Sequence, residues 1–345
     1  MKNKVPKIFN EIDKSNLRKI ILEFPKQFRI GIKRAENIQI KNKFKRIFIC
    51  GIGGSALPGE LLKMYFENAK IKIPLFLHQD YQLPHLVEKG DLLVTISYSG
   101  NTEETISSFE EALEKKLNLV SITSNGRLSE LCRANKIPVA IIPPGIPPRF
   151  SLGYLFSALL KILANSKIIS PDFNEIFSLE NKLNPERLEG QGKKLAEKLK
   201  NKIPLIYSSR LNFPLAKIWK IKFNENSKIP AFANFFPELN HNEMVGFANL
   251  GSQKLNLKNF YILILKDLTD YPSIIKRMDL TTKILKKKGI KIAEINLEEK
   301  KFFPKIFSNL SLADWVSYYL ALNYQIDPAP VEIVEEFKKK MKNEK

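Results

Sequence analysis

Residues 93–102 read Leu-Val-Thr-Ile-Ser-Tyr-Ser-Gly-Asn-Thr, and this stretch decides the fold. Its apolar half, which ends at Ser97, has the pattern of a buried parallel strand. Residues 103–116 follow, and they place Ile106 and Phe109 on one face of a helix. The sequence therefore predicts a strand, a turn rich in hydroxyl groups and a helix.

The turn between these two elements carries three side-chain hydroxyls, those of Ser97, Ser99 and Thr102. The N-terminus of a helix presents unpaired backbone N–H groups and the positive end of the helix dipole, which together bind phosphate without a basic side chain. A single hydroxyl that caps the helix is the ordinary alternative. Because capping needs one hydroxyl and the turn offers three, we interpret residues 97–102 as a phosphate-binding turn.

A second turn, rich in glycine, lies upstream. Residues 46–50 form a short apolar strand, and Gly51-Ile-Gly-Gly-Ser-Ala56 follows directly. Glycines let the backbone approach a ligand closely. The segment also fits the dinucleotide fingerprint G-x-G-x-x-G/A, with Asp80 as a possible ribose-binding acid, so a nucleotide-dependent oxidoreductase is an alternative. Pro58 early in the next helix and the separate phosphate turn disfavour that alternative.

Strands and helices alternate along most of the chain, which predicts an α/β fold with two doubly wound parallel sheets. Residues 143–148 are proline-rich, stiff and not helical. We place one domain at residues 1–155 and a second at 156–345, with the charged stretch 178–202 leading into the second set of units. The expected units fall at residues 46–68, 73–90, 91–116 and 118–134, with strands at 138–142, 203–207, 259–265 and 291–295 and helices in 1–40, 151–165, 215–223, 271–287 and 310–325.

Length and composition limit the class of protein. A chain of 345 residues with 44% apolar residues can bury two ordinary cores. No uncharged apolar run reaches about 18 residues, so we expect no membrane span, and the first residues do not resemble a secretory signal. Two isolated cysteines, Cys50 and Cys132, indicate a reducing cytoplasm, and three histidines argue against a zinc site.

The formal net charge of +20, from 56 basic and 36 acidic residues, raises the alternative of a nucleic-acid partner. The lysines are spread through nearly every segment, however, and no basic motif is interleaved with aromatic residues. A general enrichment in lysine, as in heat-adapted proteins, is the better interpretation. We expect neither nucleic acid nor membrane as a partner.

Several motifs carry a resemblance to a known family. Gly51-x-Gly-Gly-Ser-Ala56, Asp80-Tyr-x-Leu-Pro84 and Ser97-Tyr-Ser-Gly-Asn-Thr-x-Glu-Thr105 are similar to a sugar isomerase (SIS) domain. More narrowly, the chain resembles the bifunctional phosphoglucose/phosphomannose isomerases. That likeness continues through Pro147-Pro-Arg149-Phe, Phe223-Asn-Glu225-Asn, Pro237-Glu-Leu-Asn-His-Asn-Glu243 and Asp327-Pro328.

The resemblance implies two SIS-type αβα domains and an aldose–ketose isomerase. Its substrates would be fructose 6-phosphate, glucose 6-phosphate and mannose 6-phosphate, and it would use neither nucleotide nor metal. Ser97, Ser99 and Thr102 would hold the phosphate, with Gly54 and Ser55 against the sugar. A non-catalytic SIS sensor of sugar phosphates is the alternative from another class.

The resemblance also implies the residues that carry the chemistry. Glu225 would move a proton between C1 and C2 through a cis-enediolate, and Arg149 would stabilise the enediolate charge. His241, contributed by the neighbouring subunit of a homodimer, and Lys338 would open the sugar ring. From the residues alone, Glu225 and His241 read as surface side chains, Arg149 as half of an ion pair and Lys338 as part of a solvated helix. The sensor alternative would have no use for Glu225 or His241.

Overall fold

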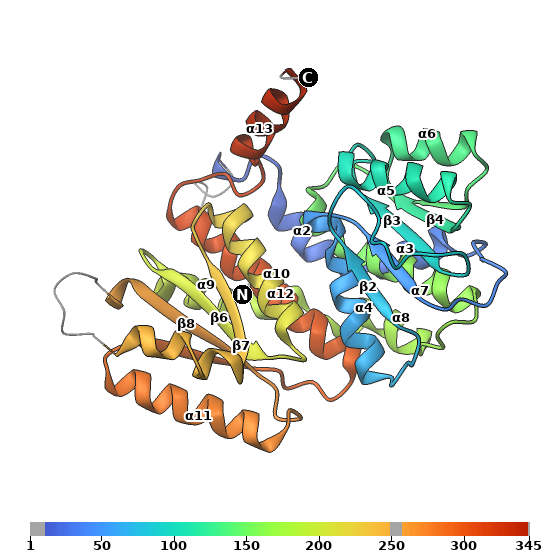
Figure 1. Ribbon diagram of the computed structural model, residues 1–345. Helices are drawn as coiled ribbons and strands as arrows, with labels where there is room; N and C mark the ends of the chain where they lie inside the picture. The colour runs from blue at the N-terminus through green and yellow to red at the C-terminus, as the bar shows by residue number, and fades with distance from the viewer. Residues whose placement is uncertain (1–10, 249–256, 344–345) are drawn as a thin grey trace. The chain divides into compact units, whose positions relative to one another are not determined.

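The structure, a computed structural model, describes residues 11–248 and 257–343 and divides into two compact units (Figure 1). The unit with the phosphate turn, here the N-terminal unit, contains residues 23–183 and 299–305. The C-terminal unit contains the described parts of 1–22, 184–298 and 306–345. The sequence-based boundary at residue 155 falls inside a helix of the N-terminal unit, α7 (Leu152–Asn165).

The N-terminal unit is built on a five-stranded sheet with the order β2-β1-β3-β4-β5, in which all neighbours are parallel. Every residue of β1 and β3 is buried, as expected for a parallel sheet covered on both faces. The predicted strand before the phosphate turn is thus the central strand of the sheet. The strands are β1 (Ile47–Cys50), β2 (Leu75–His78), β3 (Leu92–Ser97), β4 (Asn118–Thr123) and β5 (Val139–Ile141).

Helices cover both faces of this sheet. On one face Phe48 and Leu93 pack with Phe109 of α5 and Leu128 of α6 in one apolar core. On the other face Ile49 reaches α4, which in turn packs against α7. The remaining helices of the unit are α3 (Lys26–Arg34), α4 (Leu57–Asn68), α5 (Glu103–Glu114), α6 (Gly126–Ala134) and α8 (Phe173–Lys182).

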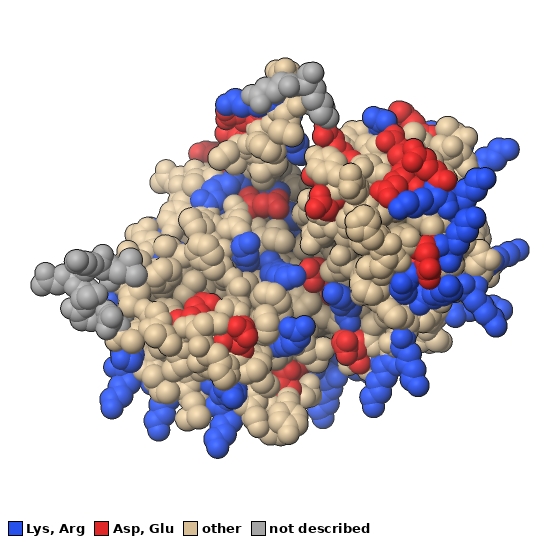
Figure 2. All heavy atoms as spheres, in the orientation of Figure 1, with Lys and Arg blue, Asp and Glu red and all other residues tan. Residues whose placement is uncertain are grey.

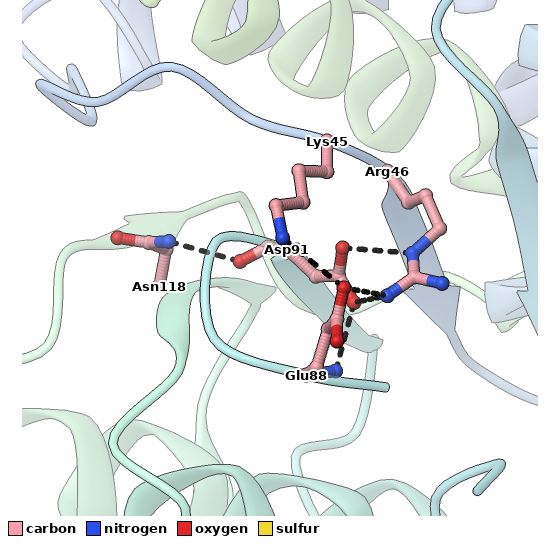
Figure 3. Close-up of polar contacts among 5 residues, drawn as sticks. All are labelled: Lys45, Arg46, Glu88, Asp91 and Asn118. Carbon is pink, nitrogen blue, oxygen red and sulfur yellow. Dashed lines mark hydrogen bonds and ion pairs between the residues drawn. The ribbon is translucent and has the colours of Figure 1, made fainter. Parts of the chain in front are cut away.

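Polar side chains join the strands of this sheet at their amino ends, opposite the predicted site (Figure 3). We call Lys45, Arg46, Glu88, Asp91 and Asn118 the amino-end cluster. The guanidinium of Arg46 binds both carboxylate oxygens of Asp91, each at 2.9 Å, and the Asn118 amide donates to the Asp91 carbonyl at 3.0 Å. The Asp91 side chain is only 1% exposed and also accepts the Glu88 N–H at 2.9 Å. The cluster thus fixes the starts of β1, β3 and β4.

The C-terminal unit contains a four-stranded parallel sheet with the order β7-β6-β8-β9. The strands are β6 (Ile203–Ser209), β7 (Phe232–Phe236), β8 (Phe260–Lys266) and β9 (Lys291–Asn296). The sequence analysis placed β6, β8 and β9 correctly and missed β7. The helices are α2 (Leu17–Glu23), α9 (Pro185–Leu199), α10 (Phe213–Lys222), α11 (Pro272–Lys287), α12 (Phe302–Asn323) and α13 (Glu332–Asn343). The last residue of α2 and the first residues of α12, up to position 305, are assigned to the N-terminal unit.

Helices occupy most of the described residues 11–40, and charged side chains are spread over the face drawn in Figure 2. Of the predicted helical segment 1–40, residues 1–10 lie outside the described residues, and α2 and α3 occupy most of the rest. Lysine and arginine side chains are spread over the face in Figure 2, with acidic side chains among them. None of the helices in the described residues combines the length and the apolar character that a membrane span requires.

Candidate active site

The phosphate turn, residues 97–102, joins β3 to α5. Ser97 is the buried last residue of β3; its hydroxyl lies 2.9 Å from that of Thr102 and accepts the N–H of Gly100 at 3.1 Å. Ser99 is exposed. Thr102 is the N-cap residue of α5, but its side chain accepts no hydrogen bond from the first helical turn. The ordinary capping interpretation therefore fails for Thr102, and the N-terminal end of α5 can serve an anion.

The turn is fixed by the loop that follows β4. Gly100 has a φ of 73°, and a Cβ atom built there would stand 1.7 Å from the carbonyl oxygen of Asn125. The carbonyl of Tyr98 accepts the N–H of Ser124 at 3.0 Å and its hydroxyl at 2.6 Å. These contacts hold the backbone of the turn in place.

Gly54 and Ser55 make structural contacts that the sequence did not indicate. A Cβ atom on Gly54 would lie 2.8 Å from the Arg149 nitrogen and from the Pro148 carbonyl carbon, so the glycine permits the close approach of this segment. Ser55 is buried, and its hydroxyl accepts the N–H of Tyr98 at 2.9 Å. Both residues thus join the glycine turn to other parts of the site, and their contact with a sugar stays a prediction.

Arg149 lies in a short 3₁₀ turn, Pro148–Phe150, and is only 1% exposed. Its guanidinium stands 5.4 Å from the centre of the Phe150 ring. Tyr98 fixes the proline-rich segment before it, because the Tyr98 hydroxyl donates to the Pro143 carbonyl at 3.0 Å and accepts the Ile146 N–H at 3.2 Å. Burial raises the pKa of Tyr98 despite the opposing Ile146 N–H. Tyr98 therefore remains a neutral phenol that can make both bonds.

Gln27, on α3, supports the segment that follows Arg149. Its amide nitrogen donates to the Phe150 carbonyl at 2.8 Å, and its amide oxygen accepts the Gly153 N–H at 3.1 Å. Gln27 is buried, so both bonds form away from solvent. The sequence analysis found neither Gln27 nor Tyr98. The Tyr inside Ser-Tyr-Ser was visible in the sequence, but nothing in it showed where the hydroxyl would bind.

Glu225 lies in a π-helical turn, Phe223–Ser227, that continues α10 directly. π-helical turns are rare and frequently occur at functional sites. Glu225 is half-buried, so it is not the fully solvated surface residue that composition alone suggests. The Asn224 side chain donates to the Ile229 carbonyl at 2.9 Å and closes the turn on itself.

The π-turn is anchored to α12 by polar contacts in the interior. Lys222 forms an ion pair with Asp314 at 2.5 Å, and both side chains are 5% exposed or less. Asn226 donates to the Ser317 hydroxyl at 2.9 Å, and Ser227 donates to the Ser317 carbonyl at 2.8 Å. Because unpaired buried polar groups are costly, these contacts strongly favour one position of the turn.

His241 follows a 3₁₀ turn, Glu238–Asn240, just after β7 and is exposed. The backbone N–H of His241 donates to the Glu238 carbonyl at 3.0 Å. The Asn240 side chain donates to the Thr281 hydroxyl of α11 at 2.8 Å. The segment thus presents an exposed imidazole from a fixed backbone.

Glu243 holds the same segment from inside. Its two carboxylate oxygens accept the Tyr207 hydroxyl and the Asn234 amide, each at 2.5 Å. Burial, followed by the negative charge of Glu243, raises the pKa of Tyr207, so the phenol stays protonated as the donor. The Glu243 carboxylate therefore anchors the His241 segment to Tyr207 and Asn234.

Lys338 lies on α13, where its ammonium binds Glu335 at 2.8 Å and its side chain is 60% exposed. Lys339 and Lys340 beside it are also exposed. The structure thus shows Lys338 in a surface ion pair, and its part in catalysis stays a prediction. In the described residues no group of three or more His, Cys, Asp or Glu side chains could hold a metal ion.

Comparison with known proteins agrees with these features. Residues 41–164 match the SIS domain, and residues 188–341 match the bacterial phospho-glucose isomerase C-terminal SIS domain. The C-terminal domain of a glucosamine-fructose-6-phosphate aminotransferase from Francisella tularensis has a similar fold, with a TM-score of 0.68 at 20% identity over 91% of this chain and 98% of that one. The fold and the hydroxyl-lined turn therefore define a protein made of two SIS domains.

Two relatives narrow the class. A bifunctional phosphoglucose/phosphomannose isomerase of Aquifex aeolicus is 37% identical over 87% of this chain and 91% of the relative. One of Caldicellulosiruptor bescii is 36% identical over 93% of this chain and 97% of the relative. The chain belongs to the bifunctional phosphoglucose/phosphomannose isomerase family.

Proposed function

We propose that this protein interconverts fructose 6-phosphate with glucose 6-phosphate and with mannose 6-phosphate. The observation that carries the proposal is the similarity to enzymes of that name along nearly the whole length of both chains. Residues 188–341, which match the bacterial phospho-glucose isomerase C-terminal SIS domain, include the π-turn and the His241 segment. A non-catalytic sensor would have no use for Glu225 or His241. The phosphate turn supports the same substrate class, because it can bind a sugar phosphate through hydroxyls and a helix N-terminus.

The residue roles follow from this reaction. Ser97, Ser99 and Thr102 hold the phosphate, and Glu225 removes a proton from C1 of the open-chain ketose. The resulting cis-enediol(ate) takes the proton back at C2 and becomes an aldose. Delivery to one face of C2 gives the glucose product, and delivery to the other face gives the mannose product.

Arg149, Gly54 and Ser55 complete the sugar site in this proposal, with the guanidinium against the charge of the enediolate. His241 and Lys338 move protons during ring opening. We propose a homodimer in which His241 serves the site of the neighbouring subunit, with the phosphate in the domain of residues 1–155 and the base in that of 156–345. His241 is exposed, and this supports the proposal because a side chain that serves another subunit must be accessible to it.

The decisive experiment measures fructose 6-phosphate conversion, with glucose 6-phosphate and mannose 6-phosphate read separately. We expect Glu225→Gln to lower kcat by about a hundredfold or more, because the amide cannot take the proton. Glu197→Gln, at an exposed carboxylate on α9, is the matched control and should leave kcat unchanged. A wild-type protein that binds fructose 6-phosphate without turnover would reverse the choice in favour of the sensor.

The proposed chemistry is an internal proton shift, so it requires no metal ion or nucleotide. We expect the rate of conversion to persist in excess EDTA and without added nucleotide. Loss of activity in EDTA that added divalent cation restores would contradict this part of the proposal.

A further inference from the structure

Lys228, directly after the π-turn, joins the Glu225 peptide to a distant part of the chain. Its ammonium donates to the backbone carbonyl of Glu225 at 2.5 Å and to that of Pro328 at 3.2 Å. The second segment is itself fixed, because the Ala329 N–H donates to the Asp327 carboxylate at 3.0 Å. One ammonium thus joins the end of the π-turn to Pro328, which lies 100 positions after Lys228 in the sequence.

The backbone of Lys228 suits this task. The residue has a φ of 56° and a ψ of 37°, the left-handed conformation that ends many helices, and its N–H closes the turn on the Phe223 carbonyl. The last carbonyls of a helix lack partners within the helix, and a lysine side chain near the end can bind them. Here the lysine binds the carbonyl of the very residue that we propose as the base.

The π-turn needs such support. Its hydrogen bonds span five residues instead of four, and relaxation to a regular α-helix would turn the Glu225 side chain about the helix axis. Asn226 and Ser227 hold the turn on the α12 side, whereas Lys228 holds the Glu225 peptide itself. Loss of the ammonium would remove the side-chain contact that holds the Glu225 peptide, while Asn226 and Ser227 keep the rest of the turn on α12.

We propose that Lys228 is the positioning residue for the base: it sets the place of the Glu225 carboxylate relative to C1 and C2 of the sugar. The inference rests on the proposed isomerase function. A displaced base should slow proton transfer without weakening substrate binding, because the phosphate turn is separate. It should also change the two rates of protonation at C2 unequally, since the glucose and mannose products form from opposite faces.

The test measures kcat, KM and the ratio of glucose to mannose product for fructose 6-phosphate in Lys228→Met, whose side chain is of similar length and uncharged. We expect kcat to fall by about tenfold to a hundredfold, KM to change by less than about twofold and the product ratio to shift. Lys228→Arg, which can donate to both carbonyls, should recover most of kcat.

Two further variants separate the ammonium from the backbone. Lys228→Gly favours the left-handed conformation, so it should keep the melting temperature and still lose kcat. Lys116→Met is the matched control, since Lys116 is an exposed lysine with a φ of 52° at the end of α5, and it should behave like the wild type.

An active wild type whose Lys228→Met variant loses melting temperature but keeps kcat and product ratio would overturn this inference alone. An inert wild type would overturn the proposed function and the inference with it.

Discussion

Gly100 shows how one residue can fix the phosphate turn. Its left-handed backbone, with a φ of 73°, and the Asn125 carbonyl 1.7 Å from the position of a Cβ atom both exclude a side chain. We expect Gly100→Ala to lower the free energy of unfolding by about 2–4 kcal/mol, from backbone strain and overpacking together. Urea denaturation checks the value.

Gly53 offers the matched control for Gly100. It has a φ of 57°, but apart from the glycine and its two chain neighbours no atom of the described residues lies within 4 Å of its Cβ position. Gly53→Ala should therefore show only the backbone cost of about 1–2 kcal/mol. Equal losses in the two variants would mean that the contact with Asn125 does not matter.

His78 at the end of β2 makes stability depend on pH. Burial lowers its pKa below 6.5 against the opposing effect of Asp80, and its Nε2 atom has no hydrogen-bond partner among the described residues. The unfolded state therefore binds the proton more readily, and stability falls as the pH drops below about 6.5, with a limiting slope of about 1.4 kcal/mol per pH unit.

Removal of this histidine should flatten that slope. In urea titrations at several pH values below about 6.5, we expect His78→Asn to lose less stability per pH unit than the wild type. His85→Asn, at an exposed histidine, should keep the wild-type slope. A His78→Asn slope equal to that of the wild type would assign the acid sensitivity to other groups.

At the scale of elements, the amino-end cluster should stabilise the first sheet. The Asp91 carboxylate is buried and accepts three hydrogen bonds, two of them from the Arg46 guanidinium. We expect Asp91→Asn to lower the free energy of unfolding by about 2 kcal/mol, the range for hydrogen bonds to charged groups. Glu110→Gln breaks an exposed ion pair with Arg127 and should cost less than about 0.5 kcal/mol. Chemical denaturation of both variants decides whether burial makes this difference.

The buried middle strands β1 and β3 could be predicted from the sequence, whereas one edge strand, β7, could not. β1 and β3 are uninterrupted apolar runs because helices cover both of their faces. β7 is at the edge, with Phe232 54% exposed, and polar Asn234 interrupts its apolar pattern. The Asn234 amide binds Glu243 in the folded chain, and the sequence pattern of the strand does not show this contact.

The same division applies to the candidate site. The hydroxyl turn and the proline-stiffened segment are local patterns, so the sequence displays them. The supports of Arg149 are not local: Gln27 and Tyr98 reach its segment from 123 and 48 positions away. The sequence likewise shows a glycine at position 54, but it does not show that the backbone of Pro148 and Arg149 lies against it.

At the scale of the whole molecule, the proposed homodimer can be tested with dimers of two different variant chains. If His241 serves the neighbouring subunit's site, Glu225 and His241 of one site belong to different chains. A dimer of one Glu225→Gln chain and one His241→Asn chain then holds one site with both changes and one site with neither. If both residues act within one chain, each site of the mixed dimer carries one change.

The two arrangements differ in a measurable way. Co-expression with two affinity tags gives purified mixed dimers, and we expect about half of the wild-type kcat per dimer, although each parent dimer is nearly inactive. Mixed dimers of two differently tagged Glu225→Gln chains are the control and should stay inactive. Mixed dimers as inactive as their parents would place Glu225 and His241 in the same chain, and a monomeric wild type with full activity would exclude a shared site altogether.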